Sequence, residues 1–416
     1  MKRRVVVTGL GAITPVGNDV AATWNSLLEG KSGAGPITKF DASTFPVRFA
    51  AEVKGFDPHQ FMERKEAKRS DVYTQYAMAA AVEAMEDAGL SNGTTPYDPD
   101  RMGVIIGSGI GGLKSFEEQH DVYRERGPGK ISPFFIPMFI ADIAAGIVSM
   151  RFNAKGPNYA TISACATSAH AIGDAYRAIQ YGDADVVITG GAEATVTPMA
   201  IGGFANMRAL SERNDSPETA SRPFDATRDG FVMGEGAGIV ILEEMEHALN
   251  RGARVYAEVA GYGATGDAYH LTAPAPGGEG AQRAMRRAMK DAGLAPEMVQ
   301  YINAHGTSTP ANDLNETMAI KAAFGEAARD VNVSSTKSST GHMLGAAGAV
   351  EFLISTLVIH ESKIPPTINY AEPDPDCDLN YTPNHMIERE VSAALSNSFG
   401  FGGHNVALAV KRFSAE

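Results

Sequence analysis

Cysteine is scarce in this chain of 416 residues, which contains only Cys165 and Cys377. Two cysteines so far apart are too few for a framework of disulfides or for a zinc ribbon. Cys377 lies among the aspartates of segment 374–378, whose carboxylates raise the pKa of a neighbouring thiol. These alternating aspartates lack the glutamate that closes a calcium-binding loop. We therefore expect Cys377 to be unreactive and the chain to hold no catalytic metal.

Long apolar runs and an excess of basic residues are also absent. No apolar run reaches the roughly 18 residues that a transmembrane helix requires. The N-terminal segment 1–9 is basic and then apolar, but its apolar part is too short for a secretory signal. The formal net charge is −13, whereas nucleic-acid binding requires a basic face. We therefore predict a cytoplasmic protein that binds neither nucleic acid nor a membrane.

Nucleotide-binding motifs are missing as well, although the chain has 44 glycines. Its glycine-rich loops, 107–112 and 400–403, do not show the Gly-x-Gly-x-x-Gly pattern that opens a helix and is followed by an acid about 20 residues later. The sequence also lacks the lysine pattern of a P-loop. We expect no nucleotide cofactor.

What the sequence does contain is an internal repeat. Segment 85–90, Met-Glu-Asp-Ala-Gly-Leu, recurs as Met-Lys-Asp-Ala-Gly-Leu at 289–294, and each copy ends a predicted helix with a glycine at the usual left-handed position. A second echo pairs Cys165-x4-His170 with Lys337-x4-His342. The two echoes indicate a duplication. We predict two similar halves, 1–250 and 251–416, that pack as one rigid unit without a low-complexity linker.

Strand-like and helix-like segments alternate along the whole chain, which predicts an α/β fold with largely parallel sheets. The helices expected after Cys165 and at 345–360 are apolar on nearly every face, which is typical of helices buried between layers. Two buried helices between two sheets predict a five-layered αβαβα sandwich. The expected strands are 5–8, 104–106, 186–189, 239–242, 255–261, 301–304 and 331–334.

Cys165 lies between a β-branched run at 159–162 and a helix-like run at 170–180. This layout places the sulfur near the N-terminus of a helix, whose dipole favours the thiolate over the thiol. The thiolate is the nucleophilic form of cysteine. The alternative is a buried structural cysteine, which is common.

Two histidines lie in separate loops rich in glycine, serine and threonine. One loop, 303–310, contains His305, and the other, 335–342, contains Lys337 and His342. A single histidine is more often structural, and we assign no role to the others, including His170. Two such loops together with Cys165 indicate acyl-thioester chemistry.

These residues resemble the β-ketoacyl-acyl carrier protein synthases of the thiolase-like superfamily, in particular the members that elongate long acyl chains in dissociated fatty acid synthesis. The resemblance implies a thiolase-like fold, a homodimer, and decarboxylative condensation of an acyl group with malonyl-acyl carrier protein. It implies no nucleotide, metal or flavin cofactor. The matching motifs, in family order, are 5–11, 211–215, 221–225, 229–232, 303–307, 337–342 and 397–403.

Related classes remain as alternatives. A short-chain type I synthase and a polyketide ketosynthase use the same chemistry. A degradative thiolase uses coenzyme A and a second catalytic cysteine in the C-terminal glycine-rich loop, where Cys377 does not lie. The non-enzymatic chain-length partner subunit of polyketide systems lacks the nucleophile, whereas Cys165 is present here.

The resemblance assigns the catalytic roles residue by residue. Cys165 carries the acyl group, and its backbone N–H acts with that of Phe401 as an oxyanion hole. His305 and His342 stabilise the carbanion formed when malonyl loses carbon dioxide. Lys337, the fourth catalytic candidate, pairs with Glu351 in a structural and electrostatic role; the alternatives are that it abstracts a proton or binds the malonyl carboxylate directly. Two further acids, for which ordinary helix capping is the alternative, order the His305 loop: Asp313 and Glu316.

The resemblance also identifies residues that contact substrate. Hydroxyl groups in the His305 loop are suited to hydrogen-bond the amides of a phosphopantetheine arm. Other residues line the pocket that receives the acyl chain. A glycine-containing loop forms the gate to this pocket. The residues concerned are Thr307 and Thr309 for the arm, Ile110 and Phe204 for the pocket, and Phe399, Phe401 and Gly402 for the gate.

An acidic carrier protein needs a local basic patch on a chain of net charge −13. A solvated helix face is the alternative explanation of such clusters. The homodimer contact is expected to involve the apolar stretch 134–140. The candidate docking residues are Arg64, Lys65, Lys68, Arg69, Arg124, Arg126, Lys130 and Arg208.

Overall fold

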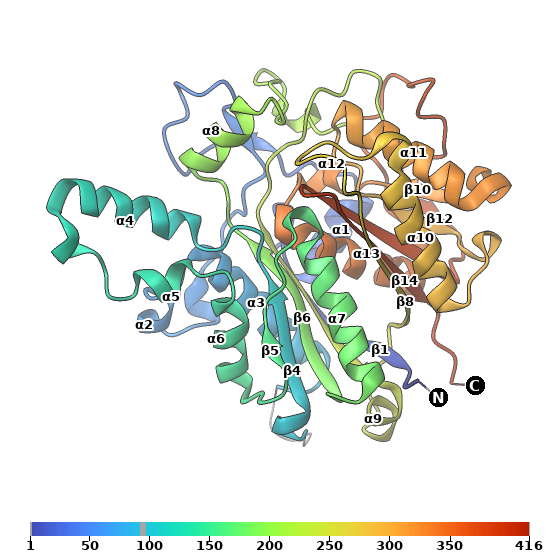
Figure 1. The fold of residues 1–416 in the computed structure, drawn as a ribbon, viewed down its shortest axis with the longest axis horizontal. Helices are drawn as coiled ribbons and strands as arrows, with labels where there is room; N and C mark the ends of the chain where they lie inside the picture. The colour runs from blue at the N-terminus through green and yellow to red at the C-terminus, as the bar shows by residue number, and fades with distance from the viewer. Residues whose placement is uncertain (1, 92–96, 416) are drawn as a thin grey trace.

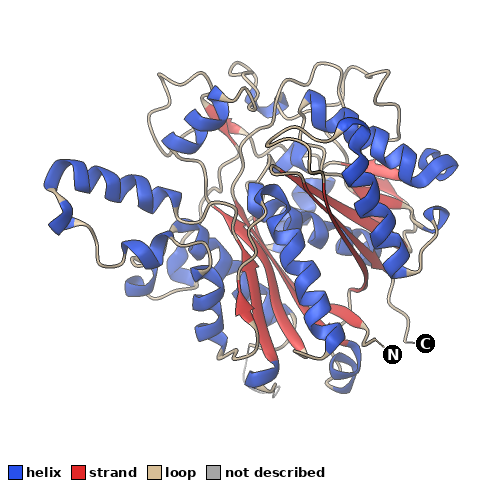
Figure 2. Ribbon diagram, viewed as in Figure 1, coloured by secondary structure: helices blue, strands red, loops and turns tan. Residues whose placement is uncertain are grey.

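A computed structural model describes residues 2–91 and 97–415. Within these residues one sheet of ten strands runs through the molecule in the order β10-β9-β13-β14-β8-β1-β7-β6-β4-β5 (Figures 1 and 2). Its N-terminal strands are β1 (Val5–Ile13), β4 (Met102–Gly107), β5 (Asn158–Tyr159), β6 (Val186–Glu193) and β7 (Gly236–Glu244). Its C-terminal strands are β8 (Ala257–Gly266), β9 (Tyr301–Asn303), β10 (Asn332–Ser334), β13 (Ala393–Gly400) and β14 (His404–Lys411).

The sheet consists of two sets of five strands with the same topology. In the first set β1 is antiparallel to β7, β7 is antiparallel to β6, and β6, β4 and β5 are parallel. In the second, β8 is antiparallel to β14, β14 is antiparallel to β13, and β13, β9 and β10 are parallel. The described strands connect the sets at one seam, where Val5–Val7 of β1 pair with residues 257–259 of β8. The strands therefore correspond one to one, in the same order.

Each set of five strands forms one layer, and helices form the other three layers. In the middle layer α7 (Thr167–Tyr181) packs on β6 and β4, and α13 (Ala347–Glu361) packs on β13 and β7. One outer layer contains α3 (Val72–Asp87) and α6 (Ile143–Phe152), and the other contains α10 (Glu279–Ala292) and α11 (Pro310–Phe324). Every residue of β1 and β7 is buried because helices cover both faces of the sheet. The predicted five-layered sandwich is confirmed.

The middle helix α13 corrects one expectation. By length and composition Leu344–Glu361 could span a membrane, although inspection of the sequence found no such run. Within the fold 89% of this segment is buried, and α13 is buried from Ala347 to Ile359. Its apolar character is explained by packing between the two sets of five strands.

Two sequence predictions were incomplete. The hairpin of β13 and β14 was not among the expected strands. Of the run 159–162 before Cys165, only Tyr159 lies in a strand, β5. The echo between Cys165 and Lys337 was wrong. The turn at Cys165, Ala164–Ala166, corresponds instead to the turn Leu344–Ala346, which begins α13. Each turn opens with a left-handed residue, Ala164 (φ 51°) or Leu344 (φ 46°), so the counterpart of Cys165 is Gly345.

The remaining elements surround this sandwich. α4 (Leu113–Arg126) and α5 (Phe135–Phe139) project from the body at the left of Figure 1, close to α2 (Arg64–Ala67). The other helices are α1 (Val20–Leu28), α8 (Pro198–Asn206), α9 (Met245–Asn250) and α12 (Lys337–Thr340). Two small sheets pair β2 (Gly35–Pro36) with β3 (Phe49–Ala50) and β11 (Lys363–Ile364) with β12 (Ile387–Glu388).

Candidate active site

Cys165 opens on a cavity of about 460 Å³ that also receives side chains from the other half of the chain. The cysteine is free, 9% exposed, and lies in the turn before α7. The cavity collects most of the residues that the sequence predicted as catalytic or substrate-binding. Those that line it are Cys165, His305, His342, Phe401, Thr307, Thr309, Ile110, Phe204 and Phe399, and the docking candidate Arg208 also lies in its wall.

The electrostatic setting of Cys165 differs from the expectation. Burial raises the pKa of its thiol to about 12, and the nearby charge of Lys337 acts in the opposite direction. The thiol is therefore protonated at neutral pH in the empty site. The start of a helix does not by itself supply the thiolate predicted from the sequence, because desolvation penalises the charged sulfur more strongly.

The loop between β13 and β14 approaches the sulfur through its backbone. The N–H of Phe401 donates a hydrogen bond to Cys165. A Cβ on Gly400 would lie 2.6 Å from the carbonyl oxygen of Ser163 and 3.1 Å from the nitrogen of Cys165, so only glycine permits this approach. The backbone N–H of Phe401 is thus held at Cys165.

His305 and His342 lie in contact inside the cavity, with ring centroids 5.3 Å apart. Burial and the charge of Lys337 lower the pKa of both rings well below the usual value of 6.5. Both imidazoles are therefore neutral at physiological pH. The Nδ1 atom of each ring is buried and has no hydrogen-bonding partner among the described residues. Two neutral rings can donate N–H groups to a developing negative charge without adding a net positive charge.

Backbone contacts fix the position of each histidine. The N–H of His342 donates to the carbonyl oxygen of Val232 at 2.7 Å, and its own carbonyl accepts from Gly234 at 2.9 Å. The carboxylate of Glu316, on α11, accepts the N–H groups of His305 at 2.8 Å and Gly306 at 2.7 Å. Glu316 therefore orders the His305 loop, in agreement with the contact expected from the sequence.

Asp313, one turn before Glu316 on α11, supports a different segment. Its carboxylate accepts the N–H of Phe224 at 2.9 Å and lies 3.6 Å from the guanidinium of Arg228. Burial raises the pKa of Asp313, and these contacts act against that rise. Asp313 thus links α11 to the segment around Phe224.

Lys337 and Glu351 form a buried ion pair below the histidines. Their side chains are 1% and 3% exposed, and they come from α12 and α13. Burial raises the pKa of Glu351 to about 7, and Lys337 counteracts part of this effect. The second carboxylate oxygen, Oε2, has no partner among the described residues. The pairing predicted from the resemblance is present.

The predicted substrate contacts are largely gathered on the cavity wall. The hydroxyl groups of Thr307 and Thr309 are 2.9 Å apart. The ring of Phe204 lies 6.4 Å from that of Phe401. Gly402, in contrast, does not line the cavity; with φ 88° it forms the turn, and its N–H donates to the carbonyl oxygen of Leu271 at 2.7 Å.

The candidate docking residues are all exposed, and two groups of them lie on neighbouring helices. Arg64 and Lys65 are on α2, followed by Lys68 and Arg69, and the guanidinium of Arg69 stacks 4.2 Å from the ring centroid of Phe134. The second group lies on α4 and the turn after it: Arg124, Arg126 and Lys130. Arg208 lies separately, in the wall of the cavity.

Several residues of the cavity wall were not predicted from the sequence, among them Phe231, Asp267 and Glu193. Phe231 packs against His342 with centroids 5.3 Å apart. Asp267 accepts a hydrogen bond from the side chain of Asn405 at 2.7 Å. Glu193, at the end of β6, is fully buried although it is charged. The only sequence feature that could have pointed to Glu193 is its place as a single acid at the end of an apolar strand.

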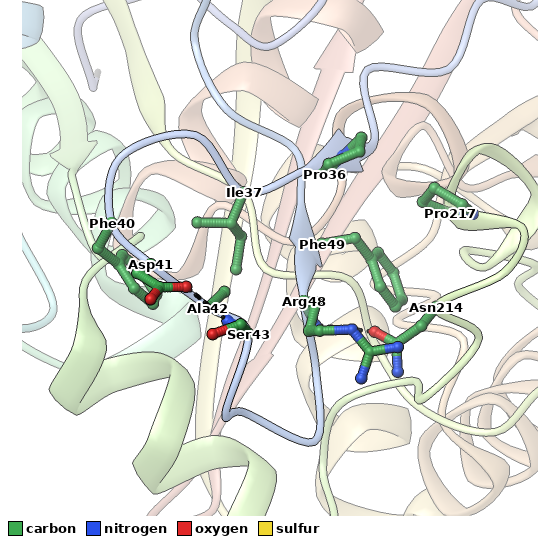
Figure 3. A pocket seen from close by; sticks show the side chains of 10 residues that line it. All are labelled: Pro36, Ile37, Phe40, Asp41, Ala42, Ser43, Arg48, Phe49, Asn214 and Pro217. Carbon is green, nitrogen blue, oxygen red and sulfur yellow. Dashed lines mark hydrogen bonds between the residues drawn. The ribbon is translucent and has the colours of Figure 1, made fainter.

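Two further cavities contain none of the predicted site residues. The first, of about 410 Å³, lies beside the loop before β3 (Figure 3). In it Asp41 accepts the N–H of Ser43 at 3.0 Å, and the N–H of Arg48 donates to Asn214 at 2.8 Å. The second, of about 320 Å³, includes Glu83. Among residues 2–91 and 97–415 no group of three or more His, Cys, Asp and Glu side chains could hold a metal ion.

Comparison with known proteins gives a family for this arrangement. Residues 2–248 match the family "Beta-ketoacyl synthase, N-terminal domain", and residues 256–371 match "Beta-ketoacyl synthase, C-terminal domain". The chain is 56% identical over 412 residues to a 3-oxoacyl-[acyl-carrier-protein] synthase 2 of Synechocystis sp., with 99% of each chain covered. It is 55% identical over 413 residues to the protein of that name from Staphylococcus aureus, again with 99% of each covered.

Solved structures agree with this assignment. A β-ketoacyl synthase from Burkholderia phymatum superimposes with a TM-score of 0.92 at 35% identity, and 100% of both chains is covered. A type II polyketide ketosynthase, solved in complex with its acyl-carrier protein, gives 0.91 at 38% identity with the same coverage. From its sequence matches and its fold, the chain belongs to the β-ketoacyl synthase family.

Proposed function

We propose that this chain is a condensing enzyme that extends an acyl group on Cys165 with malonyl-acyl carrier protein. The products are 3-oxoacyl-acyl carrier protein, carbon dioxide and free carrier protein. The observation that carries the proposal is the meeting of Cys165, two neutral imidazoles and the N–H of Phe401 in one cavity. The names of the full-length relatives at 55–56% identity favour fatty acid elongation over polyketide synthesis.

In the first half-reaction the sulfur of Cys165 attacks the thioester carbonyl of an acyl-loaded carrier protein. The carbonyl oxygen becomes an oxyanion, which the N–H groups of Cys165 and Phe401 stabilise. The intermediate collapses, the carbon–sulfur bond to the phosphopantetheine arm breaks, and the arm leaves as a thiol. Because the resting thiol is protonated, its proton passes to the departing sulfur of the arm, which leaves as a neutral thiol.

In the second half-reaction malonyl-carrier protein enters the same cavity. Its terminal carbon–carbon bond breaks, carbon dioxide leaves, and the electron pair moves onto the thioester as an enolate. N–H groups of His305 and His342 stabilise the enolate oxygen. The enolate carbon then attacks the acyl carbonyl on Cys165, and the sulfur is released as the leaving group and is protonated again.

The remaining residues have supporting roles in this proposal. Burial keeps the histidines neutral by lowering the pKa of both rings, and the positive charge of Lys337, paired with Glu351, adds to this effect. Glu316 fixes the His305 loop, and Asp313 the segment beside it. Thr307 and Thr309 bind the pantetheine amides, Ile110 and Phe204 line the acyl chain, and Phe399 and Gly402 belong to the gating loop. We divide the chain into 1–250, which supplies the nucleophile, and 251–416, which supplies the histidines.

The partner of this proposal is acyl carrier protein, which docks on the basic residues of α2, α4 and the cavity mouth. A homodimer is supported by the open edge of β5, whose residues Asn158 and Tyr159 are exposed. Exposed apolar side chains lie on α5 and between β5 and α7, among them Ile136 (58%) and Ile162 (63%). We place the enzyme in the cytoplasm, where its carrier-bound substrates are made.

Intact mass spectrometry tests the first half-reaction. The protein is incubated with carrier proteins loaded with acyl chains of different length, and the mass added to the chain is followed with time. We expect one acyl adduct, which is absent in Cys165→Ala and unchanged in Cys377→Ala, a matched control at the other buried cysteine. An adduct that survives in Cys165→Ala, or no adduct with any chain, would overturn the proposal.

A further inference from the structure

The duplicated halves contain two topologically equivalent sites, of which one holds Cys165. At the catalytic site the turn with Cys165 meets the loop after β9, which carries His305, and the loop after β13, which carries Phe401. The topological counterparts are the turn with Gly345, the loop after β4 and the end of β6. In the described residues these three segments also meet, at the side chain of Glu193.

At this second site the carboxylate of Glu193 accepts four hydrogen bonds. Oε1 accepts from the hydroxyl of Ser108 at 2.9 Å and the N–H of Ile110 at 3.2 Å. Oε2 accepts from the N–H of Gly109 and from the N–H of Gly345, each at 2.9 Å. A carboxylate thus lies in a nest of backbone donors at the position that corresponds to the substrate of the catalytic half.

Glycine makes this nest. A Cβ on Gly109 would lie 2.7 Å from Oε2 of Glu193, and a Cβ on Gly345 would lie 2.6 Å from the same atom. Glu193 itself is 0% exposed, and its four bonds join segments that are far apart in the sequence. An unpaired carboxylate at this depth would be costly, so the four donors and Glu193 require one another.

The second site forms part of the acyl cavity. Glu193, Gly109, Ile110 and Leu344 all line it together with Cys165. Two of these, Ile110 and Leu344, supply apolar side chains. The N–H of Ile110 donates to the Glu193 carboxylate, and so does the N–H of Gly345, the residue after Leu344. The backbone on both sides of this wall is therefore fixed by one side chain.

We propose that Glu193 is a positioning residue that fills the counterpart of the catalytic site and, by holding the segments of Ile110 and Leu344, sets the acyl chain length that the cavity accepts. The proposal rests on the proposed function, because it concerns the cavity that receives the acyl group. It assigns Glu193 no contact with the reacting atoms.

The test compares acylation of Cys165 by long and short acyl-carrier proteins in Glu193→Gln and in the unchanged protein. Glutamine has the same shape but turns an N–H₂ group toward backbone donors, which releases one side of the wall. We expect the ratio of kcat/KM for long over short chains to fall about tenfold, since a misplaced apolar wall weakens binding of only the chains that reach it. Carbon dioxide release from malonyl-carrier protein, measured without primer, is expected to stay within about twofold because the histidines do not contact Glu193.

Two further variants keep the test decisive. Glu83→Gln is the matched control, because Glu83 also accepts two backbone N–H groups, from Ala12 and Val20, but lies outside the acyl cavity. It is expected to leave the chain-length ratio unchanged. If Glu193→Gln does not fold, Ser108→Ala removes one of the four bonds to Glu193 and is expected to shift the ratio in the same direction, by less.

Formate separates the carboxylate itself from a general loosening of the cavity. In Glu193→Ala the four donors lack their acceptor, and millimolar formate is expected to restore the long-chain preference, whereas chloride at equal ionic strength is not. An unchanged ratio in Glu193→Gln and Ser108→Ala, or a fall that formate does not reverse, would overturn the inference. Failure of Cys165 to accept any acyl chain in the unchanged protein would instead overturn the proposed function.

Discussion

The rings of His305 and His342 meet edge to face, with centroids 5.3 Å apart and an interplanar angle of 85°. Their backbones belong to separate segments, one held by Glu316 on α11 and the other paired with Val232 and Gly234. Because the pKa of each ring is lowered well below 6.5, the pair offers neutral donors over the whole physiological range of pH. The predictions below follow from this geometry and from the groups around it.

Replacement of either histidine separates the two half-reactions. In His305→Ala and in His342→Ala we expect acylation of Cys165 to persist and release of carbon dioxide from malonyl-carrier protein to fall by about 10²–10³-fold, the usual effect of losing one oxyanion donor. Labelled carbon dioxide and intact mass measure the two steps. His385→Ala, at an exposed histidine, is the control. Equal losses in both steps would contradict the separate roles.

The Lys337–Glu351 pair is expected to respond in opposite ways to single and double replacement. Lys337→Met leaves Glu351 buried without a counter-charge, so the free energy of unfolding should fall by about 3–5 kcal/mol. Lys337→Met with Glu351→Leu removes both charges and should regain most of that stability while activity stays low. Urea denaturation measures the stability, and a double variant no more stable than the single one would refute the argument.

Alkylation of Cys165 should depend on pH without a plateau in the ordinary range. Burial raises the pKa of the thiol to about 12, so it is neutral below that pH and the thiolate fraction rises about tenfold with each pH unit up to there. The iodoacetamide rate, measured in Cys377→Ala to isolate Cys165, should therefore still be rising at pH 10. A plateau near pH 8 or 9 would show that the helix terminus outweighs burial after all.

A methyl group at Gly400 should impair acylation selectively. Its Cβ would lie 2.6 Å from the carbonyl oxygen of Ser163, so the backbone must move and the N–H of Phe401 with it. We expect Gly400→Ala to slow formation of the acyl adduct by about 10²–10³-fold, with malonyl-carrier binding changed much less. Gly35→Ala, which meets no atom within 4 Å, is the matched control.

Charge reversal at Lys65 on α2 and at Arg69 just after it tests whether the carrier protein docks on these basic residues. Lys65→Glu with Arg69→Glu should raise KM for carrier-bound substrates, most strongly at low salt, and leave kcat nearly unchanged. Arg329→Glu, at a site 81% exposed, controls for net charge. A KM that does not depend on these two residues would remove α2 from the docking surface.

The sequence was sufficient to single out the residues to which we assign the chemistry, because they lie in loops of small residues. Cys165, His305, His342 and Lys337 stand out because reactive side chains between glycines and serines have few structural reasons to be there. Buried strands such as β1, β6 and β7 were also predictable, since strands covered on both faces are continuously apolar. The hairpin of β13 and β14 was not predicted, because the polar residues 396–398 interrupt the apolar pattern of β13.

Residues that act through backbone contacts were not predictable in this way. Glu193 is one acid after an apolar strand, and nothing in its neighbourhood shows that Gly109 and Gly345 will converge on it. Likewise the protonated state of Cys165 depends on how completely the fold buries the sulfur, which the helix-terminus argument ignores. The counterpart of Cys165 is a glycine, so a search for similar side chains could not find it.

The seam between β1 and β8 has a consequence for how the active site is assembled. Until that seam closes, the N-terminal half holds Cys165 without the N–H donor of Phe401. The C-terminal half holds His305 and His342 without the acyl-cysteine that the enolate attacks. While the halves are apart, the cavity that brings these groups together therefore does not exist. Closing the seam and assembling the site are thus one event.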